Sequence, residues 1–477
     1  MKSNIDTSSE NTTNKKKNPY GLTGLTNPTL TTCYMNSAIQ ALSHNYPLTS
    51  FFFEKKHEIH GILLKNARKI FKDSEEFKLS ESDNNALKLM ESNAKSDDPF
   101  ILTDYELILG LKQKIQDANY CTSMLNIREQ EIIYNHTITA QLIKLLETMW
   151  KKNSIIIPTS FRKVFSEARN KFFFGYEQHD AEEAYSCIIQ KMQEELSEEK
   201  KIKFKSSNSV HSLLQFKDNI SKKIRSTNDI KEKEQFLEIY YKKKLEMPVE
   251  SLRIEAYREM QKYYEKCYSR ITEIFCGFLH SSIKCPHEKC GYVKNKFEPF
   301  LHLSLEIPHV ANSNNYERNI SIDDCINYFC QDEALDEKNL WNCEKCNNKV
   351  CAIKNLRLWT IPPVLVIQFK RFKQSNTGVV SKDERLITYP VEHFDVSPII
   401  SPTQINECGC NKYRLQCVIN HKGGKEGGHY YTYCLDEDSG NWYVFNDMIV
   451  TKINNLRQIV TRTAYLLFYI REDLIVK

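Results

Sequence analysis

The chain has 477 residues, of which 41% are hydrophobic and 11% aromatic, enough apolar material for about two to three domains; this excludes a wholly disordered protein. A net charge of +5, from 66 Lys and Arg against 61 Asp and Glu, is too small to indicate nucleic-acid or membrane binding by itself. No apolar run approaches the roughly 20 residues that a membrane span needs, so we expect no membrane association.

The chain begins with a polar segment, residues 1–20, which lacks the apolar stretch of a secretory signal. We therefore expect a disordered tail and a protein of the cytoplasm and/or the nucleus. Because these compartments are reducing, the 16 cysteines are expected to be metal ligands, a nucleophile or core residues rather than disulfides.

The first half of the chain favours helices. A loop from residue 21 leads into a helix that starts at Cys33, and residues 45–165 lean towards helix. A second clear helix starts near Asp180, where Asp180 and Glu183 have the spacing of a capping box. The apolar face of the first helix is formed by Met35, Ala38, Ile39 and Leu42.

Residues 197–270 differ in composition, with 18 Lys and Arg against 12 Asp and Glu. We expect charged helices or a partly ordered insertion there, either as a solvated surface or as a basic surface for an acidic partner. From about residue 271 short alternating segments predict strands, among them 297–305, 413–419, 429–435, 441–445 and 464–470. The sequence thus predicts an α+β fold with an antiparallel sheet in its second half.

Two distant residues suggest nucleophilic catalysis. Cys33 opens a helix, whose N-terminal partial positive charge favours a thiolate, but taken alone this is weak evidence against the alternative of a plain buried core thiol. His429 follows the Gly427-Gly428 turn at the start of a strand, and Asn446 or Asp447 ends the next strand, where it could orient the imidazole. This is the nucleophile, base and orienter arrangement of cysteine hydrolases; a core histidine is the alternative.

Several separate motifs, in this order along the chain, resemble the ubiquitin-specific protease family of deubiquitinases. They are Gly24-Leu25-Thr26-Asn27 with Thr32-Cys33-Tyr34-Met35-Asn36-Ser37, Gln178-His179-Asp180-Ala181-Glu182-Glu183, the strand pattern at 361–372, Gly428-His429-Tyr430, Trp442-Tyr443-Val444-Phe445-Asn446-Asp447, and 464–469.

The resemblance implies a papain-like cysteine peptidase over residues 21–472. We expect a helical thumb at about 21–196, the charged insertion at about 197–270, and β-rich fingers and palm at about 271–472. The implied reaction is hydrolysis of the isopeptide or peptide bond after the C-terminal glycine of ubiquitin, so ubiquitin and ubiquitinated proteins are the expected partners.

The resemblance also implies roles for single residues. Cys33 would be the nucleophile, His429 the general base and acid, and Asn446 the residue that orients the imidazole, with Asp447 assisting. Asp180 would bind basic side chains of the ubiquitin tail, although it could instead only cap its helix. The residues implied in substrate binding are Asp180, Gln178, Gly428 and Tyr430.

The loop before Cys33 departs from the family pattern, which has an oxyanion-stabilising Asn five residues before the nucleophile. Pro28 stands there, and Leu30 occupies an expected glycine position. A one-residue insertion would let Asn27 keep the role; otherwise the hydroxyls of Thr29 or Thr31 and backbone N–H groups must serve. Losing one oxyanion donor costs about 10² to 10³ in rate, so the alternative to an active protease is a catalytically weak or inactive ubiquitin-binding pseudoprotease.

Two cysteine pairs predict a structural zinc site in the fingers. Cys343 and Cys346 have the spacing of a zinc knuckle, and Cys285 and Cys290 form a looser pair that encloses His287, an alternative ligand. We expect Zn²⁺ on the four cysteines, with no cofactor needed for catalysis; four reduced thiols are the alternative.

A zinc-ribbon protein that binds nucleic acid is a third possible reading of the sequence. It would use the basic excess of residues 197–270, but that segment lacks regular interleaving of aromatic residues and its positive charges are diluted by acidic ones. We therefore do not expect a nucleic-acid partner.

Overall fold

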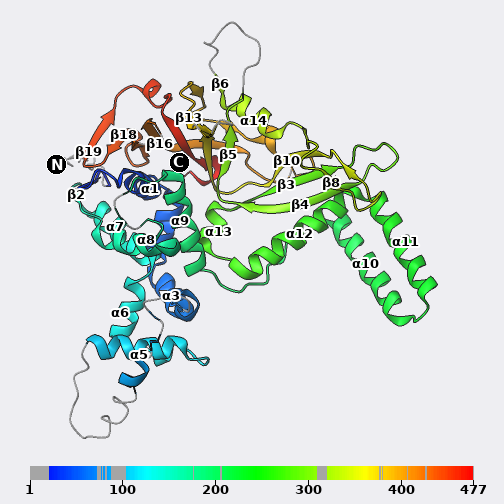
Figure 1. The fold of residues 1–477 in the computed structure, drawn as a ribbon, viewed down its shortest axis with the longest axis horizontal. Coiled ribbons are helices and arrows are strands. Elements are labelled where there is room, and N and C mark those ends of the chain that lie inside the picture. Colours follow the sequence, from blue (N-terminus) through cyan, green and yellow to red (C-terminus); the bar gives the residue numbers. More distant parts are fainter. Residues whose placement is uncertain are drawn as a thin grey trace, which may run out of the picture.

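The computed structural model describes residues 21–475 apart from 72–76, 78, 81–82, 88–103, 174, 176, 205–206, 309–319, 375–377, 379, 405–406 and 425–426. The expected disordered tail, residues 1–20, lies outside the described residues. Helices dominate the first half of the chain and strands the second, so the α+β prediction is confirmed (Figure 1).

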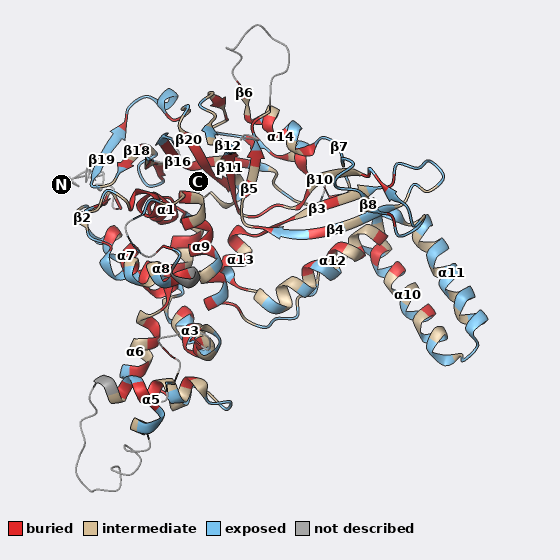
Figure 2. Ribbon diagram, viewed as in Figure 1, coloured by how far each residue is buried: buried red, intermediate tan, exposed pale blue. Residues whose placement is uncertain are grey.

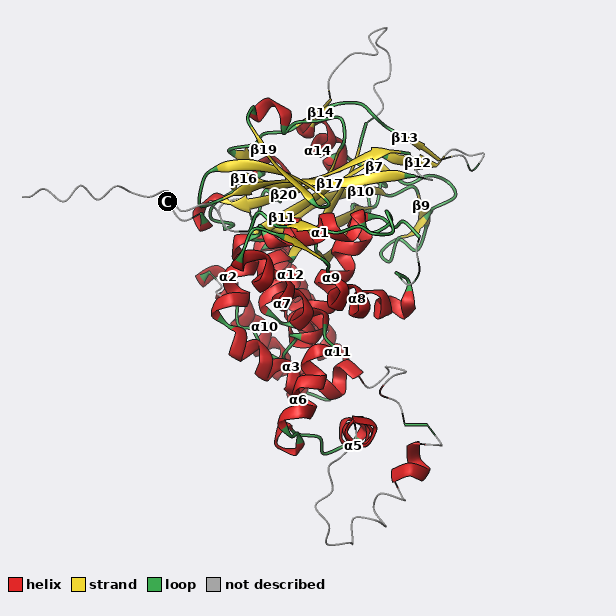
Figure 3. Ribbon diagram, turned by 90° about the vertical axis from the view of Figure 1, so that its left-hand side faces the viewer, coloured by secondary structure: helices red, strands yellow, loops and turns green. Residues whose placement is uncertain are grey.

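Helices precede and cover the sheets (Figure 3). The helices of the first half are α1 (Cys33–Ser43), α2 (Tyr46–Glu54), α3 (Lys56–Phe71), α5 (Asp104–Gln116), α6 (Ile127–Asn135), α7 (Ile138–Lys151), α8 (Thr159–Lys171) and α9 (Ala181–Glu195). They are followed by α10 (Asn208–Ser226), α11 (Ile230–Glu246), α12 (Pro248–Cys267), α13 (Arg270–Phe275) and α14 (Ile322–Cys330). No helix in this described part of the chain has the length and apolar character to cross a membrane.

The largest sheet of the described residues has the strand order β19-β18-β17-β16-β20-β11-β5, with β15 paired to β16. Neighbouring strands are antiparallel except β11 and β5, which are parallel. The strands are β5 (Leu303–Glu306), β11 (Val364–Lys370), β15 (Phe394–Asp395), β16 (Lys412–Gly423), β17 (Gly428–Asp436), β18 (Asn441–Asn446), β19 (Ile449–Ile453) and β20 (Ala464–Arg471).

A second sheet has the order β4-β3-β10-β7 and carries the cysteine pairs near one end. Its strands are β3 (Gly277–Lys284), β4 (Val293–Phe300), β7 (Glu333–Ala334) and β10 (Ile353–Thr360), and the paired strands β8 (Trp341–Asn342) and β9 (Lys349–Val350) adjoin the second cysteine pair. Short strand pairs elsewhere are β1 (Gly24–Leu25) with β2 (Ile155–Ile156), β12 (Phe372–Gln374) with β13 (Val380–Lys382), and β6 (Ile320–Ser321) with β14 (Ile387–Thr388).

The large sheet is buried on both faces, because successive residues of β11 enter different cores. Val364 and Val366 join the core shared with α1, α7 and α9, whereas Leu365 and Ile367 join a core with α14. Figure 2 shows this burial concentrated where the helices meet the sheet. The sheet thereby fixes the position of α1, which packs directly on β17.

The charged insertion, residues 197–270, forms three long helices, α10 to α12. Of its two predicted forms, charged helices and a partly ordered insertion, the structure shows the helices. The hairpin of α10 and α11 extends away from the body of the protein, and α11 has no buried residue (Figures 1 and 2). Because helices rich in Lys, Arg, Asp and Glu bury little apolar area, most of their surface stays charged and exposed to solvent.

Two local predictions are wrong. The carboxylate of Asp180 caps α9 by accepting from the N–H of Glu182 at 2.7 Å, so Asp180 and Glu183 do not form a capping box. The alternating segment 297–305 is not one strand, because β4 ends at Phe300 and β5 starts at Leu303 in the other sheet. The alternating apolar pattern runs on across the break between β4 and β5 because residues on both sides of it face a core.

Candidate active site and metal centre

Cys33 is the first residue of α1 and is almost completely buried, with 1% of its surface exposed. The first N–H groups of a helix have no partner within the helix, so they and the helix dipole favour negative charge beside the Cys33 thiol. Packing of α1 on β17, including a 3.1 Å hydrogen bond from the Thr432 hydroxyl to the Ser37 carbonyl oxygen, fixes this end of the helix against the strand that carries His429.

His429 lies near the start of β17 and contacts two of the predicted site residues. Its Nε2 lies 2.6 Å from Oδ1 of Asn446, so the amide oxygen accepts a hydrogen bond from the imidazole. A side-chain hydrogen bond with Cys33 raises the pKa of His429 to about 9; burial opposes this shift, and Asn446 and the Asp447 charge support it. Since Nε2 faces Asn446, Nδ1 is the ring nitrogen left for the thiol.

Asp447 holds the loop before Cys33 rather than the imidazole. It occupies the left-handed backbone region at φ +48° in the turn between β18 and β19. Its carboxylate accepts hydrogen bonds from Nδ2 of Asn36 at 2.9 Å and Nδ2 of Asn27 at 3.1 Å, and its carbonyl oxygen accepts from the Leu25 N–H. Asp447 therefore contacts residues on both sides of Cys33 in the chain, Asn27 before it and Asn36 after it.

The departure in the loop before Cys33 has a defined geometry. Oδ1 of Asn27 accepts from the backbone N–H and the hydroxyl of Thr32, which fixes the amide against the residue that precedes Cys33. Leu30, at the expected glycine position, has φ +57°, a conformation that costs a residue other than glycine free energy. The hydroxyls of Thr29 and Thr31, the alternative oxyanion donors, lie 2.8 Å apart and bond to each other.

Asp180 both caps α9 and contacts a residue of the central sheet. Its Oδ2 accepts from the Tyr465 hydroxyl at 2.5 Å. Burial raises the pKa of Asp180 to about 6, against the effect of the hydrogen bonds from Tyr465 and the Glu182 N–H. A partly buried carboxylate without a cation is costly, so this position suits a basic side chain of a ligand.

Gln178 connects the loop before Cys33 with the turn before His429. Its Nε2 donates to the Leu30 carbonyl oxygen and its Oε1 accepts from the Gly428 N–H, both at 3.2 Å. Gly428 must be a glycine because a Cβ there would lie 2.1 Å from Nε2 of His421. Tyr430 is buried, with its ring 4.5 Å from that of His421.

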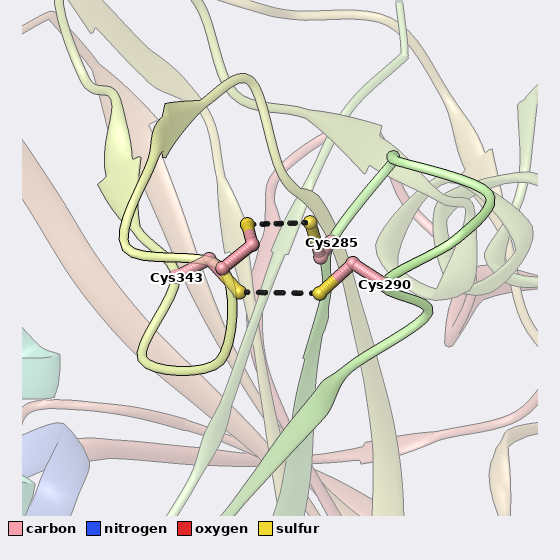
Figure 4. Close-up of side chains that lie close together, drawn as sticks. Cys285, Cys290 and Cys343 are labelled. Carbon is pink, nitrogen blue, oxygen red and sulfur yellow. Dashed lines mark hydrogen bonds between the residues drawn. The ribbon is translucent and has the colours of Figure 1, made fainter.

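The four cysteines of the predicted zinc site converge although the two pairs are more than 50 residues apart (Figure 4). Their sulfur atoms lie within 4.8 Å of one another, with 3.9 Å between Cys285 and Cys346 and 3.7 Å between Cys290 and Cys343. This is the only such group of possible metal ligands within the described ranges.

The local backbone suits a metal centre. Burial opposes ionisation of Cys343, but N–H groups of Cys346 and Lys345 and the neighbouring thiols lower its pKa to about 7. Four thiols at these distances fit a tetrahedral metal, and Zn²⁺ prefers thiolate ligands. Nδ1 of His287, the alternative ligand, lies 4.0 Å from the sulfur of Cys346, so it reaches the edge of the cluster.

Sequence reasoning missed three residues that support the site. Asn36 and Tyr465 hold Asp447 and Asp180, and His421 lies beneath Gly428. Asn36 and Tyr465 stand inside the quoted motifs, but their partners are 411 and 285 residues away. Only the spacing of Asn36, one helical turn after Cys33, offered a signal.

Comparisons with known proteins point to one family. Residues 23–469 match the family model described as "Ubiquitin carboxyl-terminal hydrolase". The chain is 48% identical over 474 residues to the probable ubiquitin carboxyl-terminal hydrolase R319 of Acanthamoeba polyphaga mimivirus, covering 99% of this chain and 95% of that protein. It is 28% identical over 356 residues to human ubiquitin carboxyl-terminal hydrolase 2, covering 74% of this chain and 50% of that relative.

Solved structures resemble the fold. A yeast SAGA DUB module carrying an Sgf73 mutant gives a TM-score of 0.52 at 20% identity, covering 95% of this chain and 69% of that chain. The SAGA Ubp8/Sgf11/Sus1/Sgf73 DUB module bound to ubiquitin aldehyde gives a TM-score of 0.50 at 21% identity, covering 95% and 70%. These similarities establish that the deubiquitinase-type fold extends over nearly the whole chain.

Proposed function

Because the chain belongs to the ubiquitin carboxyl-terminal hydrolase family, we propose that it is a deubiquitinating cysteine protease whose triad is Cys33, His429 and Asn446. Its reaction is hydrolysis of the isopeptide or peptide bond after the C-terminal glycine of ubiquitin. The observation that carries the proposal is the imidazole of His429, hydrogen-bonded to Cys33 on one side and to Asn446 on the other.

In the first half of the reaction, His429 holds the proton taken from the Cys33 thiol, and the sulfur attacks the glycine carbonyl carbon. The oxygen of that carbonyl becomes negative and is stabilised by N–H groups at the start of α1, next to the amide of Asn27. The tetrahedral intermediate collapses to a thioester as the imidazolium gives its proton to the leaving amine. Asn446 keeps the ring in the orientation that both proton transfers need.

In the second half, His429 acts as a general base on a water molecule that attacks the thioester. The bond between carbon and sulfur breaks, ubiquitin leaves with a free carboxylate, and the proton returns to the site. The same two side chains thus serve both steps.

Ubiquitin recognition is assigned to groups around this centre. The partly buried Asp180 carboxylate would pair with a basic side chain of the ubiquitin tail, and the Gly427-Gly428 turn would border the channel for the tail glycines. A structural neighbour of this chain is described as bound to ubiquitin aldehyde, which supports ubiquitin as the substrate.

The four-cysteine cluster would hold a structural Zn²⁺ ion. Cys285, Cys290, Cys343 and Cys346 would supply the four ligands, and the ion would cross-link the two cysteine loops. Both this ligand set and a Cys33 nucleophile require reduced thiols, so we keep the cytoplasm and/or the nucleus as the proposed location.

The proposal is tested with purified protein and ubiquitin carrying a C-terminal fluorogenic amide. Turnover is expected, with its loss in the Cys33→Ala variant, and a ubiquitin C-terminal electrophile is expected to label Cys33. The strained loop at Leu30 favours a second candidate, a ubiquitin-binding pseudoprotease. Binding of ubiquitin without turnover would establish that candidate and refute the protease.

A further inference from the structure

Strand β16 extends beyond its neighbour β20 in the large sheet. The pairing of the two strands ends at Asn420 and Ala464, whereas β16 continues to Gly423. On the side that faces β20, the His421 N–H still donates to the Thr463 carbonyl oxygen at 2.8 Å, but within the described residues the carbonyl oxygens of His421 and Gly423 have no strand beside them. His421 is buried, so its carbonyl oxygen needs a donor from another part of the protein.

The side chain of Lys382 supplies the donors. Lys382 ends β13, in the hairpin of β12 and β13, and its Nζ donates to the carbonyl oxygen of His421 at 2.7 Å and to that of Gly423 at 2.8 Å. Burial and the nearby Arg371 charge lower the pKa of Lys382, and the Glu384 carboxylate opposes this shift. An ammonium ion partly withdrawn from water needs acceptors in the protein, so these two hydrogen bonds tie the end of β16 to the hairpin.

The end of β16 lies opposite the residue that serves as the base. In the register of β16 with β17, Lys422 pairs with His429, and its neighbours His421 and Gly423 pair with the residues on either side of His429. The two carbonyl groups that Lys382 holds therefore flank the strand partner of His429.

We propose that Lys382 is a positioning residue, which sets the place of the His429 imidazole by holding the strand opposite to it. Strand ends with unpaired backbone groups open locally at little cost in free energy. Without the Lys382 ammonium, the end of β16 frays and β17 no longer holds the imidazole against Cys33. The effect on turnover rests on the proposed protease function, whereas the effect on the position of the imidazole does not.

The test compares Lys382→Met, which keeps the length of the side chain without its charge or donors, with Lys382→Arg, which keeps both. NMR titration of His429 is the first readout, because its raised pKa of about 9 depends on the hydrogen bond with Cys33. In Lys382→Met the pKa of His429 is expected to fall towards about 6.5, and in Lys382→Arg it should stay near 9. Loss of a positive charge would by itself raise the pKa of a nearby imidazole, so a fall reports the lost contact with Cys33.

Turnover of fluorogenic ubiquitin is the second readout. Lys382→Met should lower kcat about 10-fold, since a small displacement of a catalytic group costs rate, and Lys382→Arg should recover most of it. The matched control is Lys373→Met. Lys373 lies on β12 of the same hairpin and also donates to a backbone carbonyl oxygen, that of Ile307 at 2.9 Å, so its loss should change neither readout.

The two readouts separate this proposal from the protease function. A His429 pKa that stays near 9 in Lys382→Met would overturn the proposal, whatever the rate. Equal falls in Lys382→Met and Lys373→Met would also overturn it, because the hairpin as a whole would then be the cause. If the wild-type protein shows no turnover but the His429 pKa falls in Lys382→Met alone, the protease function fails and the role of Lys382 stands.

Discussion

At the scale of single residues, the two neighbours Asn446 and Asp447 have different partners. Asn446 contacts His429, whereas the Asp447 carboxylate contacts Asn27 and Asn36. We predict that Asn446→Ala lowers kcat about 10²- to 10⁴-fold on fluorogenic ubiquitin, because the imidazole loses the group that fixes its orientation. Asn446→Asp, which keeps an acceptor, should retain most of the activity; a wild-type rate in the alanine variant would contradict the assignment.

The raised pKa of His429 predicts a pH dependence. Hydrogen bonding to Cys33 keeps the imidazolium to about pH 9. Since the proton of the imidazolium is given to the leaving amine, kcat/KM should fall as the pH rises through about 9. The charged ring also stabilises the folded protein. This contribution is complete below about pH 6.5, the pKa of the ring in the unfolded chain, and is lost as the pH rises through about 9.

An NMR titration of His429 checks the cause. In the Cys33→Ala variant its pKa should return towards the ordinary value, because the largest contribution to the shift is gone. A pKa that stays near 9 in this variant would show that Cys33 is not the cause.

The amide of Asn27 is predicted to contribute to rate and to loop order together. Asn27→Ala removes a possible oxyanion donor and the contacts to Thr32 and Asp447, so kcat should fall about 10²-fold and the melting temperature should fall as well. Thr29→Val serves as the control, since the Thr29 hydroxyl bonds to that of Thr31 rather than to Thr32 or Asp447. An unchanged rate for Asn27→Ala would mean that Asn27 supplies no oxyanion donor.

Part of the site could be predicted from the sequence, because the spacing of residues within each motif indicates the local helix or strand. The helix starting at Cys33 and the strand starting near His429 follow from local periodicity, and the structure places both, with Asn446, in one cluster. Their catalytic roles stay predictions. The contacts of Asn36 and Tyr465 could not be predicted, because no local pattern encodes which of many buried partners lies across a gap of hundreds of residues.

At the scale of elements, the cysteine cluster joins two loops that have little core of their own. Beside the cysteines, only Val350 and Ala352 are fully buried there. We predict that the purified protein contains one zinc ion, and that a strong chelator lowers the melting temperature and exposes the amides of β8 and β9 to hydrogen exchange.

A matched pair of variants checks this prediction. Cys343→Ser should lose the metal, whereas Cys351→Ser, at an exposed cysteine outside the cluster, should keep it. Metal content measured by atomic absorption decides; full zinc in Cys343→Ser would rule out the four-cysteine site.

The type of an element could be predicted where a single sequence pattern extends over a long segment. The low Gly content and high charge of residues 197–270 allowed helices, and helices form at α10 to α12. The break between β4 and β5 was not visible, because Phe300 and Leu303 are both buried and the apolar pattern runs through the change of sheet. The parallel pairing of β5 with β11 also has no signature in a segment of four residues.

At the scale of the whole molecule, Gln178 is one of the links between the N-terminal loop and the C-terminal sheet near Cys33 and His429. Its two hydrogen bonds join Leu30 to Gly428. We predict that Gln178→Ala lowers kcat/KM about 10-fold, since each lost hydrogen bond is worth about 1 kcal/mol and the loop and turn can then separate.

The control for this link is Gln190→Ala, a glutamine exposed on α9. It should leave kcat/KM unchanged. A wild-type value in the Gln178 variant would show that the loop and the turn are held without this residue.

The position of β20 has a consequence for protein synthesis. This strand, residues 464–471, lies between β16 and β11 in the middle of the large sheet, although it comes almost last along the chain. Ser37 and Thr432, which hold α1 to β17, are 395 residues apart, and a ribosome needs roughly 20 to 80 s to cover that interval. Cys33 and His429 are therefore kept apart through most of translation, and a nascent chain that stops before β20 lacks the central strand of the sheet that brings the two together.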